Sequence, residues 1–196
     1  MGSCVSSSSR KKLSMSIYIP SWNNLHNIGG VIRTTAIFDV PLFIGEHGFR
    51  WRENKQLMEC DIITGREKKH MLKISQGVSD YEIVQSPSDF VVNENTTFVF
   101  METLEFWNAK KINPTPIYDI DIRCDVNYVF VFGNERDGLS DDVINTLVET
   151  SSIPAYITQR TGLKNIRKRH SNVSLNLAHA VVSTIGIMRG REMHIQ

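Results

Sequence analysis

The chain has 196 residues, of which 41% are hydrophobic and 22% are charged, and its formal net charge is +1. Such a chain is long enough to bury a core in one domain, and its low net charge excludes a global basic field for nucleic acid. It has no apolar run of membrane-spanning length and only scattered cysteines, so we expect a cytoplasmic protein with free thiols and no metal site.

The first 15 residues are predicted to form a flexible tail before a domain over residues 16–196. The tail begins MGSCVS, which fits the N-myristoylation pattern with Gly2 as the acceptor, and Cys4 could be palmitoylated. Two acyl chains and the basic residues that follow would anchor the chain to a membrane, because a single myristoyl chain binds only marginally. A Ser-rich leader or a remnant of cloning explains the same residues equally well.

Strand signals recur along the domain. Runs of β-branched, aromatic and apolar residues predict strands over residues 16–22, 42–44, 80–85, 96–103, 127–133 and 151–157. The run NYVFVFG at 127–133 is almost wholly apolar, as expected for a parallel strand that is buried on both faces.

Helix signals separate these strands. Helices are predicted after the caps Asn27 and Ser140 and over residues 174–190, with a helix start at 86–92 and mixed helix and loop at 49–78. The side chains expected to face the core are Ile28, Val31, Ile32, Thr35, Val143, Ile144, Leu147, Val148, Leu175, Ala178, Val181, Val182 and Ile185. The alternation predicts an α/β fold, a mostly parallel sheet flanked by helices.

Three segments carry polar residues suited to chemistry. In HNIGGVIRTT, Asn27 and Arg33 lie nearly two helical turns apart and could face one cleft, although a capped helix with a surface arginine is the ordinary explanation. In GNERDGLS, Glu135 closely follows a buried strand, where open α/β sheets place ligands, although ordinary turns have the same composition. Ser174 and Asn176 begin the last helix, where free backbone N–H groups bind polar ligands or are simply capped.

Together, and in this order, the segments resemble the signature motifs of the SpoU/TrmH branch of the SPOUT, or trefoil-knot, methyltransferases. The family patterns are N-x-G-x-x-x-R-[TS], G-x-E-x-x-G-[LM] and I-P…S-[LM]-N. The matching residues are Asn27, Gly29, Arg33 and Thr34, then Gly133, Glu135, Gly138 and Leu139, then Ile153, Pro154, Ser174, Leu175 and Asn176. The resemblance covers almost the whole chain, from Ser16 to Arg191.

The resemblance implies an enzyme that uses S-adenosylmethionine to methylate a ribose 2′-hydroxyl in RNA, with tRNA favoured over rRNA. It also implies a C-terminal trefoil knot, which is a rare exception to unknotted topology, and a homodimer whose sites take residues from both subunits. The implied cofactor-binding residues are Met101, Gly133, Ile153, Ser174 and Leu175. The implied catalytic residues are Arg33, which would stabilise the reacting hydroxyl, and Asn27, Glu135, Ser174 and Asn176, which would orient Arg33 and the ribose.

The chain departs from the family pattern between the Ile-Pro part and the Ser-Leu-Asn part of the last motif, where residues 155–173 form a markedly longer connection. Its basic residues are predicted to contact RNA phosphates, and they are Arg160, Lys164, Arg167, Lys168 and Arg169. A solvated surface insertion is the alternative, because long loops cost little stability.

Two other functions are alternatives to the methyltransferase. A catalytically silent RNA-binding or scaffold protein could use the same fold, but the joint presence of all the catalytic residue types disfavours it. A Rossmann dinucleotide enzyme is disfavoured because no G-x-G-x-x-G follows the first strand.

Overall fold

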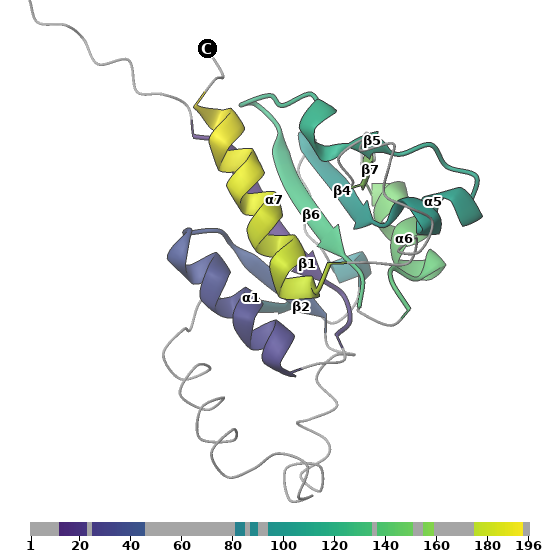
Figure 1. The fold of residues 1–196 in the computed structure, drawn as a ribbon, viewed down its shortest axis with the longest axis horizontal. Helices are drawn as coiled ribbons and strands as arrows, with labels where there is room; N and C mark the ends of the chain where they lie inside the picture. Colours follow the sequence, from purple (N-terminus) through teal and green to yellow (C-terminus); the bar gives the residue numbers. More distant parts are fainter. Residues whose placement is uncertain are drawn as a thin grey trace, which may run out of the picture.

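One parallel sheet organises the part of the chain that the computed structural model describes, which comprises residues 12–22, 25–45, 81–84, 87–89, 94–134, 137–150, 155–158 and 175–193. Every strand pair in it is parallel, in the order β3-β2-β1-β6-β4-β7-β5 (Figure 1). The strands are β1 (Ser14–Ile19), β2 (Leu42–Gly45), β3 (Tyr81–Val84), β4 (Thr96–Glu102), β5 (Thr115–Pro116), β6 (Asn127–Phe132) and β7 (Ala155–Thr158).

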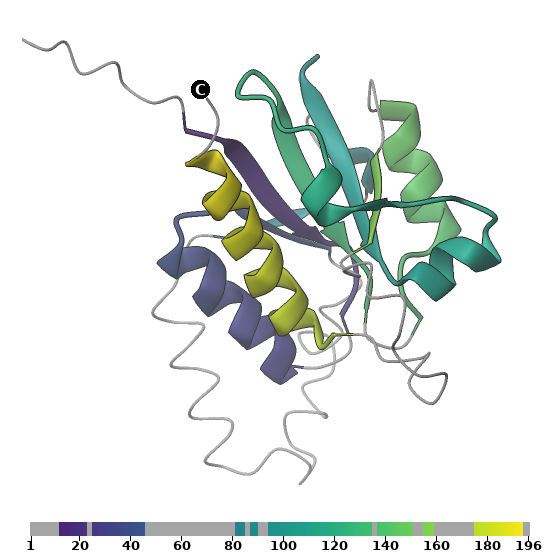
Figure 2. The same ribbon diagram turned by 45° about the horizontal axis from the view of Figure 1, so that its top comes forward.

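Helices cover both faces of this sheet. They are α1 (Leu25–Ile37), α5 (Leu104–Ala109), α6 (Asp141–Thr150) and α7 (Leu177–Glu192), with short 3-10 turns η2 (Pro87–Asp89) and η3 (Ile117–Asp119). Figures 1 and 2 show α1 and α7 side by side on one face, and α5 and α6 on the other. The predicted α/β architecture is therefore confirmed.

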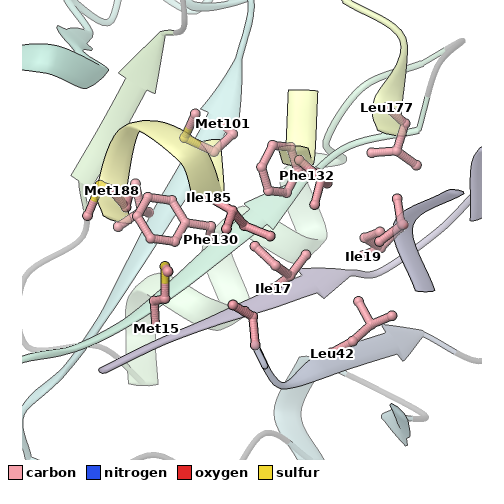
Figure 3. Close-up of a cluster of buried hydrophobic side chains, with 14 of the residues drawn as sticks. Met15, Ile17, Ile19, Leu42, Met101, Phe130, Phe132, Leu177, Ile185 and Met188 are labelled. Carbon is pink, nitrogen blue, oxygen red and sulfur yellow. The ribbon is translucent and has the colours of Figure 1, made fainter. Parts of the chain in front are cut away.

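The core lies in two layers, one on each face of the sheet. Alternate residues of a strand point to opposite faces. Phe130 and Phe132 of β6 therefore join the cluster beneath α7, while Val129 and Val131 pack on the other side with Trp107 of α5. Figure 3 shows the first cluster, which includes Met15, Ile17, Ile19, Leu42, Met101, Leu177, Ile185 and Met188. The predicted strand buried on both faces is confirmed, with β6 ending at Phe132, one residue before the predicted end.

The ends of two elements differ from the sequence expectation. β1 begins at Ser14, before the predicted domain start at residue 16, because Leu13 and Met15 are already buried in the core. Asn27 was predicted to cap the first helix, and this is wrong. The helix begins at Leu25, so Asn27 lies inside its first turn with a buried side chain.

Most side chains predicted to face inward do so, with two exceptions in the segment predicted as the last helix. Val181 and Ile185 are fully buried, whereas Leu175 is 52% exposed and Val182 is 37% exposed. Leu175 precedes the helix, which begins at Leu177, and Val182 lies about 100° around the axis from the buried Val181. Both side chains therefore miss the buried stripe.

The remaining structural predictions concern the segment after Ser86 and several segments outside the described residues. The residues after Ser86 form only the 3-10 turn η2 where the structure describes them, whereas a helix start was expected. The tail with Gly2 and Cys4, the mixed segment 49–78 and the connection at 159–174 lie outside the described residues. The trefoil knot, which would involve that connection, stays a prediction. No described helix combines the length and the apolar character needed to cross a bilayer.

Candidate active site

The three motif segments meet at one edge of the sheet, in the residues that the structure describes. β1, β6 and β4 are neighbours and run parallel, so their carboxyl ends lie side by side. β1 leads towards α1, β6 is followed by Gly133, and β4 ends at Glu102. Open α/β folds bind ligands at this edge of their sheets.

The first and third motifs are joined by a hydrogen bond between two asparagines. Nδ2 of Asn176 donates to Oδ1 of Asn27 over 2.6 Å, across 149 positions of sequence. Asn176 is also the N-cap of α7, because its Oδ1 accepts the backbone N–H of Ala178 at 3.0 Å. One side chain therefore both starts α7 and fixes the start of that helix against α1.

Gly30, which follows the glycine of the first motif, lets the two helices approach closely. A Cβ atom on Gly30 would lie 3.0 Å from the Cβ of Ala178 on α7. Thr34 hydrogen-bonds through its hydroxyl to the carbonyl oxygen of Gly30 at 2.8 Å, within the same helix. The lack of a side chain at Gly30 therefore allows close packing of α1 against α7 and does not serve a tight turn.

Arg33 lies away from this helix contact. Its side chain is exposed, whereas Asn27 is buried against α7. Six residues of an α-helix place the two side chains about 120° apart around the helix axis. Within one chain, the two side chains therefore lie on different sides of α1, as the ordinary explanation of a surface arginine expects.

The second motif forms a tight turn between β6 and α6. Its ends are bridged, since the N–H of Gly138 donates to the carbonyl oxygen of Asn134 at 3.2 Å. Gly138 has a φ of +69°, which suits glycine. The side chain of Asn134 accepts the N–H of Asp137 and donates to the hydroxyl of Ser21 at 3.1 Å. This last bond joins the turn to the segment that follows β1.

Ser140 ends the turn and begins α6. Its hydroxyl accepts the N–H of Val143 at 3.3 Å, so the predicted cap is confirmed. Ile144 and Leu147 are buried, and Val143 and Val148 pack against the same cluster, as the spacing predicted.

Glu102 contacts the same turn, and sequence reasoning missed it. Its Oε1 accepts the N–H of Leu139 at 2.7 Å, and its Oε2 accepts the N–H of Thr103 at 3.4 Å. Burial raises the pKa of Glu102 above its ordinary value, while these two N–H groups and Lys110 act in the opposite direction. An acidic residue at the end of the buried run TTFVFME was the available signal.

Some of the remaining candidates lie within the described residues and others lie outside them. Met101 is 5% exposed and is paired with Phe132 of β6, at the end of β4. Leu175 lies just before α7. The candidates outside the described residues are Glu135, Ile153, Ser174, Arg160, Lys164, Arg167, Lys168 and Arg169.

Solved structures of methyltransferases have the same fold. AviRb, a SpoU methyltransferase from Streptomyces viridochromogenes, is 15% identical with a TM-score of 0.54, over 92% of this chain and 60% of AviRb. AviRb has also been solved in complex with AdoMet. A structure that concerns the 2-OH methylation of C/U34 on tRNA is 18% identical with a TM-score of 0.57, over 95% of each chain. The A. aeolicus TrmH/SpoU tRNA modifying enzyme is 16% identical with a TM-score of 0.55, over 94% of this chain and 79% of that enzyme.

The solved structures and the family model match different extents of sequence. This chain spans 60% of the length of AviRb, and no curated protein matches its sequence significantly. The family model of the SpoU rRNA Methylase family matches residues 14–185, which is most of the chain. The resemblance identified from the three motifs is thus confirmed, and the chain belongs to the SpoU rRNA Methylase family.

Proposed function

We propose that this chain transfers a methyl group from S-adenosylmethionine to a ribose 2′-hydroxyl of RNA. The observation that carries the proposal is the meeting of the three motif segments at one sheet edge. Asn27 bonds to Asn176, and Ser21 bonds to Asn134, across 149 and 113 positions of sequence. Family membership and the AviRb complex with AdoMet support the choice of cofactor.

The proposed cofactor site consists of Met101, Gly133, Ile153, Ser174 and Leu175. Gly133 is closely packed, since a Cβ atom there would lie 2.3 Å from the carbonyl carbon of Gly138. The protein itself fills the side-chain position of Gly133, so the proposed contact with the cofactor would come from the backbone groups of this residue. When bound, S-adenosylmethionine supplies an electrophilic methyl group on a sulfonium centre.

Arg33 is the proposed catalytic residue. Methyl transfer requires an in-line approach of the 2′-oxygen to the sulfonium methyl group, and negative charge develops on that oxygen as its proton is drawn away. The positively charged guanidinium of Arg33 would stabilise that negative charge, and the proton would pass to solvent. Asn27, Glu135, Ser174 and Asn176 are proposed to orient Arg33 and the ribose.

A homodimer is proposed because Arg33 and Asn27 face different sides of α1. Arg33 of one subunit would then act in the site of its partner. Two apolar side chains are exposed here, Leu175 just before α7 and Val182 on that helix. Their exposure supports a second copy of this chain as the neighbour. Mixing two inactive variants, Arg33→Ala and Gly133→Ala, tests this arrangement. Activity returns if Arg33 acts across the interface, because one site of the mixed dimer is intact, and stays absent if it acts within its own subunit.

The proposed substrate is tRNA. Two of the similar structures concern enzymes that act on tRNA, and the basic residues of the 155–173 connection would bind RNA phosphates. Mapping of 2′-O-methyl marks in total RNA from cells with and without the gene tests both the reaction and the substrate. One or more ribose marks, expected in tRNA, should disappear without the gene. An unchanged map would favour a catalytically silent RNA-binding protein.

The N-terminal tail is proposed to anchor this otherwise cytoplasmic protein to membranes through acyl groups on Gly2 and Cys4. Metabolic labelling with a myristate analogue tests the proposal. Wild-type protein should be labelled, and the Gly2→Ala variant should not be. Equal labelling of both proteins, or no label on either, contradicts it.

A further inference from the structure

Glu102 is a charged residue at the candidate site that none of the three motifs contains. It is the last residue of β4, directly after Met101, whose partner on β6 is Phe132. Glu102 therefore lies beside Gly133, where the second motif begins. Its side chain reaches the far end of the β6–α6 turn, since Leu139 is 37 positions away in sequence and donates to it at 2.7 Å.

The carboxylate of Glu102 fills the space between the two glycines of this turn. A Cβ atom on Gly133 would lie 2.3 Å from Oε1 of Glu102, and one on Gly138 would lie 2.8 Å from the same oxygen. Both distances are shorter than any real Cβ contact. The two glycines of the motif are thus packed around one carboxylate oxygen, which also accepts the N–H of Leu139.

A second layer of side chains surrounds this contact. Phe106, on the first turns of α5, lies 3.2 Å from the position that a Cβ atom on Gly138 would take. Lys110 lies over the ring of Phe106, with Nζ 5.0 Å from the centroid, and forms an ion pair with Asp141 at the start of α6. Because Lys110 is paired with Asp141, the backbone N–H groups are the direct partners of Glu102.

A carboxylate in this position is costly to bury, which is why its pKa is raised. The cost is offset only while the carboxylate accepts hydrogen bonds, and the shorter of the two comes from the turn. A loose turn would leave a partly buried acceptor without its donor, so the carboxylate and the turn hold each other in place.

We propose that Glu102 is a positioning residue for the cofactor: its carboxylate holds Gly133 and Leu139 in the conformation that binds S-adenosylmethionine. This inference rests on the proposed function. Glu102 acts through the turn and not by contact with the reacting atoms. Its loss should therefore weaken cofactor binding more than it slows the chemical step.

The test compares Glu102→Ala, Glu102→Gln and a control, Glu149→Gln, which alters an exposed carboxylate on α6. Calorimetry at a temperature where every variant is folded gives the Kd for S-adenosylmethionine. Loss of the Leu139 bond in Glu102→Ala should raise that Kd about 10-fold, the effect of one lost hydrogen bond to a charged group. Glutamine keeps an oxygen for the Leu139 N–H, so it should raise the Kd by no more than about 3-fold.

Steady-state kinetics provide the second readout. Glu102→Ala should raise the KM for S-adenosylmethionine while kcat at saturating cofactor and the affinity for RNA stay within about 2-fold of wild type. If Glu102→Ala lowers only the unfolding temperature and binds the cofactor as wild type does, the residue is merely structural and the proposal is overturned. If the wild-type protein itself fails to bind S-adenosylmethionine, the proposed function has failed instead, and this inference falls with it.

Discussion

Asn176 and Asn27 link the two helices that begin at the candidate active site, through a hydrogen bond of 2.6 Å between their side chains. Asn176 uses its other side-chain atom to cap α7. The bond thus ties the third motif to the first, and it holds the start of α7 at the edge where β1 and β6 end.

Substitutions of Asn176 separate its two roles. Asn176→Ala removes both the cap and the link, and we expect it to lower the free energy of unfolding by about 1–2 kcal/mol. Asn176→Ser keeps a capping hydroxyl but does not reach Asn27, so it should cost about half as much. Urea denaturation of these variants, alone and combined with Asn27→Ala, gives the coupling energy of the pair. A coupling of about 0.5–1.5 kcal/mol is expected, and simple additivity would contradict the link.

The glycines of the β6–α6 turn should not tolerate a methyl group. Gly138→Ala forces alanine into a positive φ, which costs about 1–2 kcal/mol of unfolding free energy. Gly133→Ala should be worse and should abolish cofactor binding, because its Cβ atom would overlap backbone atoms of Gly138 and Leu139. Gly186→Ala is the matched control in a helix, with nothing within 4 Å of its Cβ position, and it should stabilise the protein by about 0.5–1 kcal/mol. Thermal unfolding and cofactor titration measure both effects, and equal behaviour of the three variants would refute this account of the turn.

The raised pKa of Glu102 makes part of the stability depend on pH. The folded state holds this proton more tightly than the unfolded state, so the contribution of Glu102 to stability is full below its ordinary pKa and is lost as pH rises through the raised pKa. Wild-type protein should therefore gain stability relative to Glu102→Gln when the pH is lowered from neutral towards the ordinary glutamate range. Denaturant unfolding of both proteins across that range checks the sign. A difference that stays constant, or that changes in the opposite direction, contradicts the burial of an ionisable carboxyl at residue 102.

The basic connection should govern RNA affinity through phosphate contacts. Charge reversal at Arg167, Lys168 and Arg169 should weaken RNA binding and should reduce the slope of log K against log salt by about 2–3, if each residue neutralises one phosphate. Cofactor affinity should remain unchanged in the same variant. Binding measured by fluorescence anisotropy at several salt concentrations tests this, and an unaltered affinity and slope would assign these residues to a solvated insertion.

Much of the fold could be predicted because six of the seven described strands and most of the described helices carry a strong local pattern, whereas the two-residue β5 and the short α5 were not predicted. NYVFVFG is apolar enough to be buried on both faces, and the stripe of Ile144 and Leu147 has clear helical spacing. The N-cap of a helix is harder to predict from the sequence, because a polar residue near a helix start can cap the helix or bond to a distant residue instead. Asn27 was misplaced for this reason: its partner is Asn176, 149 positions away, and no local pattern records such a distance.

The same reason explains why Glu102 was missed. The motifs identified Gly133, Gly138 and Leu139 by their spacing, but the carboxylate that they surround comes from a different strand. Only the parallel pairing of β4 with β6 brings it to the turn. Likewise, Leu175 and Val182 fit the apolar pattern of a core helix, yet the actual start and rotation of α7 leave both exposed. Tertiary placement, rather than residue type, decided these cases.

The most direct measurement of the central claim is the rate of methyl transfer by purified wild-type protein and by Arg33→Ala. The substrates are labelled S-adenosylmethionine and RNA from cells that lack the gene, and the products are analysed as nucleosides. We expect wild-type protein to form 2′-O-methyl nucleosides, and Arg33→Ala to be slower by at least about 100-fold with unchanged cofactor affinity, because one transition-state contact is lost. Methylation of a base instead of a ribose, or near-normal turnover by Arg33→Ala, would contradict the account.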